Sequence, residues 1–232
     1  MTIAPERDIF LPKQLEEYRK SPNPELITQA WQTLWEKWGK RVGLKISVPP
    51  CEAGQEELEE LRMYEYMPIY VPKELSKGEN LPDLLRVFQL KIFRILLTDE
   101  CPEVLNTITN EFEQYGWLEI EAEPIDTPYR IELWSQPDRS AYLESRIRAQ
   151  NRDGQTFNTY LIGSSFSEMT AGFSFDSSIG AVGTCCLLLG SKINGQKLMV
   201  NTRRGEANVG ECRENEIAGI RTGKKLISYF CL

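Results

Sequence analysis

The sequence predicts an α+β fold, with a helical N-terminal half followed by a mainly antiparallel β-sheet, a sandwich or a partly closed barrel. Before Trp117, apolar residues recur every three or four positions, which is typical of amphipathic helices. After Trp117, apolar and polar residues alternate, as they do in half-buried strands. We therefore expect a mainly helical region over residues 1–117 and a β region over 118–232, which form either one packed domain or two.

The clearest helix is expected to begin at Pro24. Asn23 is a favourable N-cap, Pro24 suits the first helical position, and Gly43 is a typical C-terminal stop. The apolar stripe of this helix consists of Ile27, Trp31, Leu34, Trp35 and Trp38. The rest of the N-terminal half is expected to contain a short strand over 44–50, a helix over 53–66, an extended segment over 67–75, a helix over 80–100 capped by Asn80, and a helix over 101–117 stopped by Gly116.

The C-terminal half is expected to form strands with short turns. The Asp153–Gly154 pair is a hairpin signal, and the serine-rich segment 161–178 is interpreted as a polar loop. The expected strands cover residues 118–123, 129–134, 172–178, 180–190, 196–204 and 224–230. The expected turns cover 191–195, 205–210 and 221–225.

The chain contains no histidine among its 232 residues. This excludes Ser/His/Asp and Cys/His catalytic sites, and metal or haem sites with histidine ligands. The six cysteines form no C-x-x-C pair, so neither a zinc ribbon nor a thioredoxin-type motif is expected. We accordingly expect no cofactor and no resident metal.

The net charge of -7 is distributed unevenly. Residues 191–232 contain eight Lys and Arg against four Glu, a local charge of +4, which leaves -11 on residues 1–190. An acidic body repels phosphates and disfavours nucleic-acid binding, while the basic end keeps a small anionic ligand open. No apolar run approaches the roughly 20 residues of a membrane span, and the first residues lack a signal-peptide pattern. We therefore expect a soluble, cytoplasmic protein.

Two adjacent cysteines, Cys185 and Cys186, lie in the run "GTCCLLLG". Neighbouring side chains on a strand point to opposite faces, so these two thiols are not expected to serve one site. The favoured interpretation is a buried strand in which both fill space. The alternative is a reactive thiol, which would need a lowered pKa.

Partner or ligand binding is expected from two groups of residues. Three tryptophans on one short helix form either core or a contact surface, and arginines suit carboxylate or phosphate contacts. The candidate residues are Trp31, Trp35, Trp38, Arg203, Arg204, Arg213 and Arg221. In addition, Glu57 and Glu60 are spaced to share a cation, although a solvated acidic face explains them more simply.

These observations favour a non-catalytic binding or assembly protein that acts through a protein partner or through self-association. The alternative is a small-molecule-binding protein or lyase-like enzyme that uses a pocket in the β half without histidine. A third hypothesis is an enzyme with a carboxylate-bound metal. Each hypothesis predicts a different bound species: a partner chain, a small molecule or a metal.

Overall fold

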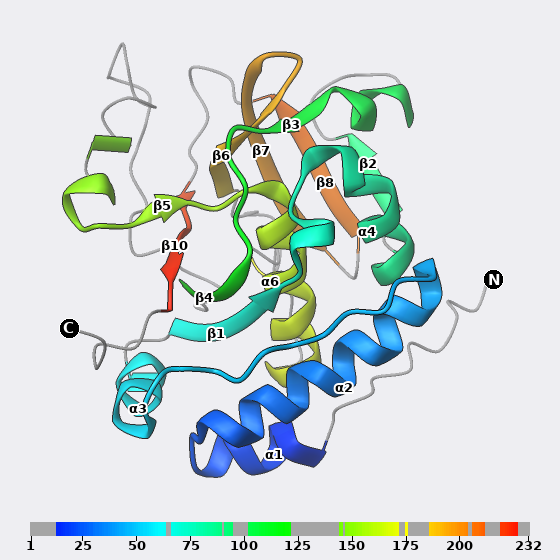
Figure 1. Ribbon diagram of the computed structural model, residues 1–232. Coiled ribbons are helices and arrows are strands. Elements are labelled where there is room, and N and C mark those ends of the chain that lie inside the picture. The colour runs from blue at the N-terminus through cyan, green and yellow to red at the C-terminus, as the bar shows by residue number, and fades with distance from the viewer. Residues whose placement is uncertain are drawn as a thin grey trace.

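The computed structural model combines helices with two β-sheets, which confirms the α+β class (Figure 1). The structure describes residues 13–63, 66–89, 91–94, 102–121, 144–145, 147–171, 175, 186–203, 206–211 and 219–226. In these ranges, no helix is long and apolar enough to cross a membrane.

The N-terminal layer contains helices α1 (Lys13–Lys20), α2 (Pro24–Val42) and α3 (Gln55–Met63). The predicted bounds of α2 are confirmed. The side-chain oxygen of Asn23 accepts hydrogen bonds from the backbone N–H groups of Glu25 (2.8 Å) and Leu26 (3.3 Å). Gly43 ends the helix in the left-handed conformation, with φ of 75°.

The tryptophans of α2 cover the outer edge of strand β1 (Tyr66–Val71), which is the first strand of its sheet. The indole N–H of Trp31 donates to the carbonyl of Pro68 (3.2 Å), and that of Trp35 donates to the carbonyl of Tyr70 (2.9 Å). An edge strand otherwise presents unpaired carbonyls to other chains. Pro68 lacks an N–H group and is tolerated at this edge because β1 pairs on one side only.

The first sheet is antiparallel and has the order β1-β4-β10-β5. Its other strands are β4 (Gly116–Glu121), β10 (Thr222–Lys225) and β5 (Asp153–Gly154). The predicted strand that begins at residue 118 is therefore confirmed as far as residue 121. Strand β10 comes from the C-terminal end of the chain, yet it lies between β4 and β5.

The second sheet has the order β2-β8-β7-β6-β3, and β9 also pairs with β6. Its strands are β2 (Lys91–Arg94), β3 (Ile108–Asn110), β6 (Cys186–Ile193), β7 (Gln196–Arg203), β8 (Glu206–Glu211) and β9 (Gly219–Ile220). The β2–β8 and β6–β9 pairs are parallel and the others are antiparallel. Asn194 and Gly195, both with positive φ, form the predicted turn between β6 and β7.

Helix α6 (Phe157–Ala171) runs through the middle of the molecule and contacts β1, β6 and α4 (Figure 1). The prediction of a polar loop over 161–178 is wrong where the structure describes it. The hydroxyl of Thr156 accepts from the N–H of Thr159 (3.2 Å), and Ser191 accepts from the N–H of Phe157 (2.8 Å). Because α6 is buried on most sides, it lacks the polar stripe by which a surface helix is identified.

Two predicted helices before Trp117 extend too far. After the single turns Lys73–Leu75 and Gly78–Asn80, helix α4 (Leu81–Phe88) ends at Gln89, whose φ is 50°, and β2 follows. The predicted helix over 101–117 consists instead of the 3-10 turn Pro102–Thr107, strand β3 and the start of β4. Each strand pairs with residues at least 45 positions away, which local periodicity does not report.

Four smaller predictions are also wrong. Residues 44–50 alternate in burial as a strand does but pair with none of the described strands, and Asp153–Gly154 pairs with β10 instead of turning a hairpin. Residues 205–210 and 221–225, expected as turns, contribute β8 and β10. The predicted strand over 129–134 lies outside the described residues.

One hydrophobic cluster contains side chains from α2, α4, α6 and both sheets. The two sheets are joined near Arg221, where the chain passes from β9 in the second sheet to β10 in the first. The N–H of Gln155 donates to the carbonyl of Arg221 (3.1 Å), and the N–H of Gly190 donates to that of Gln155 (3.1 Å). This junction positions the two charged regions described below.

Candidate functional site

A cavity of about 350 Å³ lies between the segment that follows β3, the helical residues around 144–149, β5 and β6. We call it the Asp153 pocket. Its lining residues are Glu111, Phe112, Glu144, Ile147, Arg148, Asp153, Gly154 and Leu189. Ordinary small-molecule sites occupy about 300–1,000 Å³, so the pocket is at the small end of that range.

The apolar part of the pocket comes from Ile147 and Leu189, which are both buried, and from Phe112, which is 37% exposed. Gly154 lies directly against Leu189: a Cβ atom at residue 154 would be 2.5 Å from the Cβ of Leu189. The glycine of the Asp153–Gly154 pair is therefore needed for a close approach of β5 to β6, and not for a turn.

One lysine holds two carboxylates of the pocket wall. The ammonium group of Lys197 lies 2.6 Å from Oε2 of Glu111, 2.9 Å from Oε1 of Glu144 and 2.9 Å from the carbonyl oxygen of Leu189. These three acceptors match the three N–H bonds of an ammonium group. Lys192 pairs with the other oxygen of Glu111. We call Glu111, Glu144, Lys192 and Lys197 the Lys197 network.

The network shifts two pKa values in directions that keep it ionised. Burial raises the pKa of Glu111, but the hydrogen bonds from Lys192 and Lys197 outweigh burial, so the pKa lies below its usual value. The hydrogen bond to Glu111 raises the pKa of Lys192. Both partners therefore remain charged through the neutral pH range.

Two further charged residues line the pocket with weak pairing or none. Arg148 is largely exposed, and its Nη2 lies 3.8 Å from Oε2 of Glu144. The exposed carboxylate of Asp153 has no ion-pair partner among the described residues. A tight turn brings these residues to one cavity: the N–H of Arg152 donates to the carbonyl of Ile147 (3.1 Å), and Asn151 has a φ of 54°.

A second charged region lies next to β5 and is buried. We call it the Arg152 cluster: Glu119 and Glu121 of β4, Arg152, and Thr222 of β10. Residues 119 and 121 are two apart on a strand and therefore share one face. Arg152 pairs with Glu119 through Nη1, and its Nε donates to the hydroxyl of Thr222 (2.6 Å). The N–H of Thr222 donates to Oε2 of Glu121 (3.0 Å).

In the Arg152 cluster, two buried polar atoms have no hydrogen-bond partner among the described residues: Oε1 of Glu121 and Nη2 of Arg152. Glu121 is 2% exposed and Arg152 is 7% exposed. Burial raises the pKa of Glu121, although Thr222, Arg152 and Arg221 act in the opposite direction. Each unpaired buried atom costs on the order of 1–3 kcal/mol of stability.

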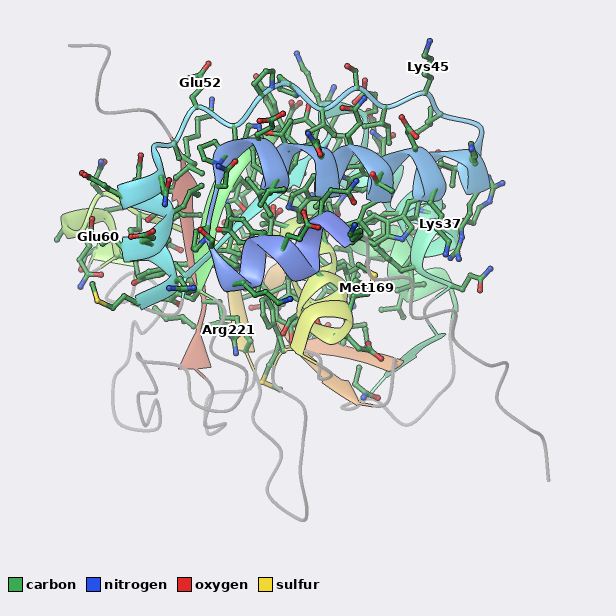
Figure 2. All side chains as sticks on the ribbon, turned by 90° about the horizontal axis from the view of Figure 1, so that it is seen from below. Lys37, Lys45, Glu52, Glu60, Met169 and Arg221 are labelled. Carbon is green, nitrogen blue, oxygen red and sulfur yellow. The ribbon has the colours of Figure 1, made fainter. Side chains whose placement is uncertain are left out.

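Arg221, predicted to bind a partner or ligand, is fully buried. Its Nη1 donates to the carbonyl of Glu121 (3.3 Å), and its guanidinium carbon lies 4.3 Å from the ring centroid of Phe175. Figure 2 shows Arg221 on the side of the sheets, away from α2. Arg221 therefore contributes to the junction of the two sheets and not to a surface patch. The side chains of Arg203, Arg204 and Arg213 lie outside the described residues.

The tryptophan stripe forms core. Trp31 and Trp35 are fully buried and Trp38 is 5% exposed, and the ring of Trp31 stacks on Phe166 of α6 with 4.7 Å between centroids. Their burial agrees with the core alternative for these residues. Cys186 is also fully buried, as the space-filling interpretation expects, whereas Cys185 lies outside the described residues.

The acidic helix α3 is mainly a solvated face. Glu60 is exposed, and Glu57 is half-buried, with its pKa raised chiefly by burial. Figure 2 shows Glu52 and Glu60 toward one end of the long helix α2, and Lys37 and Lys45 toward the other. In the part of the chain that the structure describes, no group of three or more Cys, Asp or Glu is placed to hold a metal ion.

Sequence reasoning missed the residues of the pocket. Glu111 was expected on a helix, Asp153 in a turn, and Lys197 as one of several basic residues near the C-terminus. The pocket brings together residues from 111 to 197, and no motif connects them in the sequence. Comparisons with protein-family models, with curated proteins and with solved structures give no match to this chain.

Proposed function

We propose that this chain is a non-catalytic binding protein that holds a small charged molecule in the Asp153 pocket. The observation that carries the proposal is the Lys197 network. One ammonium group with little exposure joins Glu111 to Glu144 and so fixes two walls of a cavity before any ligand arrives. A site that is already ordered loses less conformational entropy on binding.

The proposal follows the small-molecule alternative of the sequence analysis, in modified form. The assembly hypothesis relied on the three tryptophans of α2 and on four arginines, Arg203, Arg204, Arg213 and Arg221. The burial of Trp31, Trp35, Trp38 and Arg221 counts against a surface role for these four side chains, while the other three arginine side chains lie outside the described residues. The pocket is not the mouth of a barrel in the β half. It combines the β5–β6 contact with Glu111 and Phe112, which precede the predicted β region.

Native mass spectrometry on the chain purified from its own source tests this function. The expected result is a non-covalent mass excess that disappears on denaturation. Asp153→Trp, which fills the pocket, should give the bare mass, while Glu56→Trp on the exposed surface of α3 should retain the excess. Circular dichroism of both variants checks that they are folded.

Two outcomes would contradict the proposal. In the first, wild type has a bare mass and gives no saturation-transfer signal with a mixture of charged metabolites. In the second, a mass excess persists in Asp153→Trp, which would place the bound species elsewhere.

A further inference from the structure

The charges that the described residues place around the Asp153 pocket are balanced. Its walls and their ion partners include three carboxylates, on Glu111, Glu144 and Asp153, and three cations, on Lys192, Lys197 and Arg148. Such a site repels a polyanion and a polycation alike, because each meets as many like charges as opposite ones.

The Lys197 network satisfies most of these charges internally. Lys192 and Lys197 approach both oxygens of Glu111, and Lys197 also holds Glu144. One charge of each sign can still bind a ligand. The Asp153 carboxylate has no ion-pair partner among the described residues. The Arg148 guanidinium lies 3.8 Å from an oxygen of Glu144.

These two groups suit opposite ends of one ligand. A guanidinium binds a carboxylate through parallel N–H bonds, and the Asp153 carboxylate accepts hydrogen bonds from an ammonium group. Ile147, Leu189 and Phe112 line the same pocket and supply apolar surface. The volume of about 350 Å³ is small for a cofactor or a peptide and adequate for a single amino acid.

The geometry points to a free amino acid with an apolar side chain as the ligand of the Asp153 pocket. Its carboxylate binds Arg148, its ammonium group binds Asp153, and its side chain packs on Leu189, Ile147 and Phe112. This inference rests on the proposed function, because it names the ligand class of the same pocket.

Three probes with the same side chain test the inference: L-leucine, N-acetyl-L-leucine and L-leucinamide. N-acetylleucine keeps only the carboxylate and resembles the last residue of a peptide, whereas leucinamide keeps only the ammonium group and resembles the first. Titrations followed by backbone amide shifts should move Gly154 and Leu189. Leucine should bind about tenfold tighter than either single-charge probe, because each lost charged contact costs about that factor at a partly exposed site.

Two variants assign the charges. Arg148→Gln should lower the affinity for leucine to that for leucinamide and leave leucinamide binding unchanged. Asp153→Asn should lower the affinity for leucine to that for N-acetylleucine and leave N-acetylleucine binding unchanged. Asp83→Asn and Arg86→Gln are the controls, since Asp83 and Arg86 form an exposed pair on α4, at 3.2 Å, outside the pocket.

The outcomes separate the ligand class from the function. Equal binding of all three probes at Gly154 and Leu189 would overturn the amino-acid inference and leave the binding function standing. A second result would have the same meaning: no probe binds, but the wild-type protein shows a native mass excess that Asp153→Trp loses. If no probe binds and the native mass is bare, the proposed function fails as well.

Discussion

Two charged regions of the molecule meet at consecutive residues. Arg152 extends into the buried Arg152 cluster, whereas Asp153 is exposed and lines the pocket. In the Lys197 network, both oxygens of Glu111 have a lysine partner. In the Arg152 cluster, one oxygen of Glu121 and one nitrogen of Arg152 have no hydrogen-bond partner within the described part of the chain.

The two regions differ in pairing because their charged side chains differ in freedom of movement. Lysine side chains at the surface are long and flexible, and they can move until each carboxylate is paired. In the Arg152 cluster, the strand register fixes the positions of Glu119 and Glu121, and burial excludes solvent from both. Ionic pairing is therefore more complete in the Lys197 network, where it contributes less to stability. It is less complete in the Arg152 cluster, where each unpaired atom is costly.

The largest expected effect comes from removing the buried cation. Arg152→Met removes the buried partner of Glu119 and leaves it only the more distant Lys224, 3.5 Å away, so we expect a loss of about 3 kcal/mol in the free energy of unfolding. The matched control Arg148→Met removes an exposed cation and should cost about 0.5 kcal/mol or less. Urea denaturation measures both. If the two variants lose the same amount, the contrast between the regions is wrong.

The next effect concerns the centre of the Lys197 network. Lys197→Met removes three contacts of an ammonium group whose side chain is 16% exposed, and the expected loss is about 1–2 kcal/mol. Lys192→Met removes a cation whose side chain is 39% exposed, so its loss should be clearly smaller. Equal losses in urea denaturation would show that Lys197 is an ordinary surface cation.

The third prediction is a gain in the free energy of unfolding, at Glu121. The pKa of Glu121 is raised in the folded chain, so the ionised carboxylate opposes folding above the usual value of 4.5. Glu121→Gln should therefore increase the free energy of unfolding at pH 7.5, by on the order of 1 kcal/mol, and have little effect at pH 4. The comparison variant Glu119→Gln breaks the pair with Arg152 and should destabilise at pH 7.5. A loss in both variants would show that the charge on Glu121 is stabilising.

The smallest expected effect is the pH dependence of Glu111. Its pKa is lowered by the two lysines, so its contribution is present above the usual value of 4.5 and is lost as the pH falls through its folded pKa. Glu111→Gln should cost less than about 1 kcal/mol at pH 7.5, and the cost should decrease as the pH falls below 4.5. Its pH profile should slope in the opposite direction to that of Glu121→Gln. Parallel profiles from thermal unfolding between pH 3 and 7.5 would contradict this contrast.

The elements that could be predicted are those whose signals are local. Asn23, Pro24 and Gly43 mark both ends of α2, and the turn at Asn194 and Gly195 joins β6 to β7 as expected. Helix α6 could not be found from a polar stripe, because it is buried. One local signal was present, the spacing of Thr156 and Thr159 that caps its first turn.

The candidate site could not be predicted, for a different reason. Asp153 and Gly154 resemble a hairpin turn, and only the contact of Gly154 with Leu189 gives this pair another role. The role of Lys197 in fixing the pocket walls depends on Glu111 and Glu144, which are 86 and 53 positions away. Single-sequence patterns do not report such distances.

The sequence by itself determined the α+β class, the bounds of α2, the strands around residues 118 and 186–203, and the exclusion of histidine chemistry. These properties depend on composition and on residues within a few positions of one another. The tertiary structure alone decided that the tryptophans seal the edge of β1, that Arg221 joins two sheets, and that Asp153 faces a cavity. Each of these depends on strand pairing between distant segments, because burial and charge pairing are properties of the packed chain.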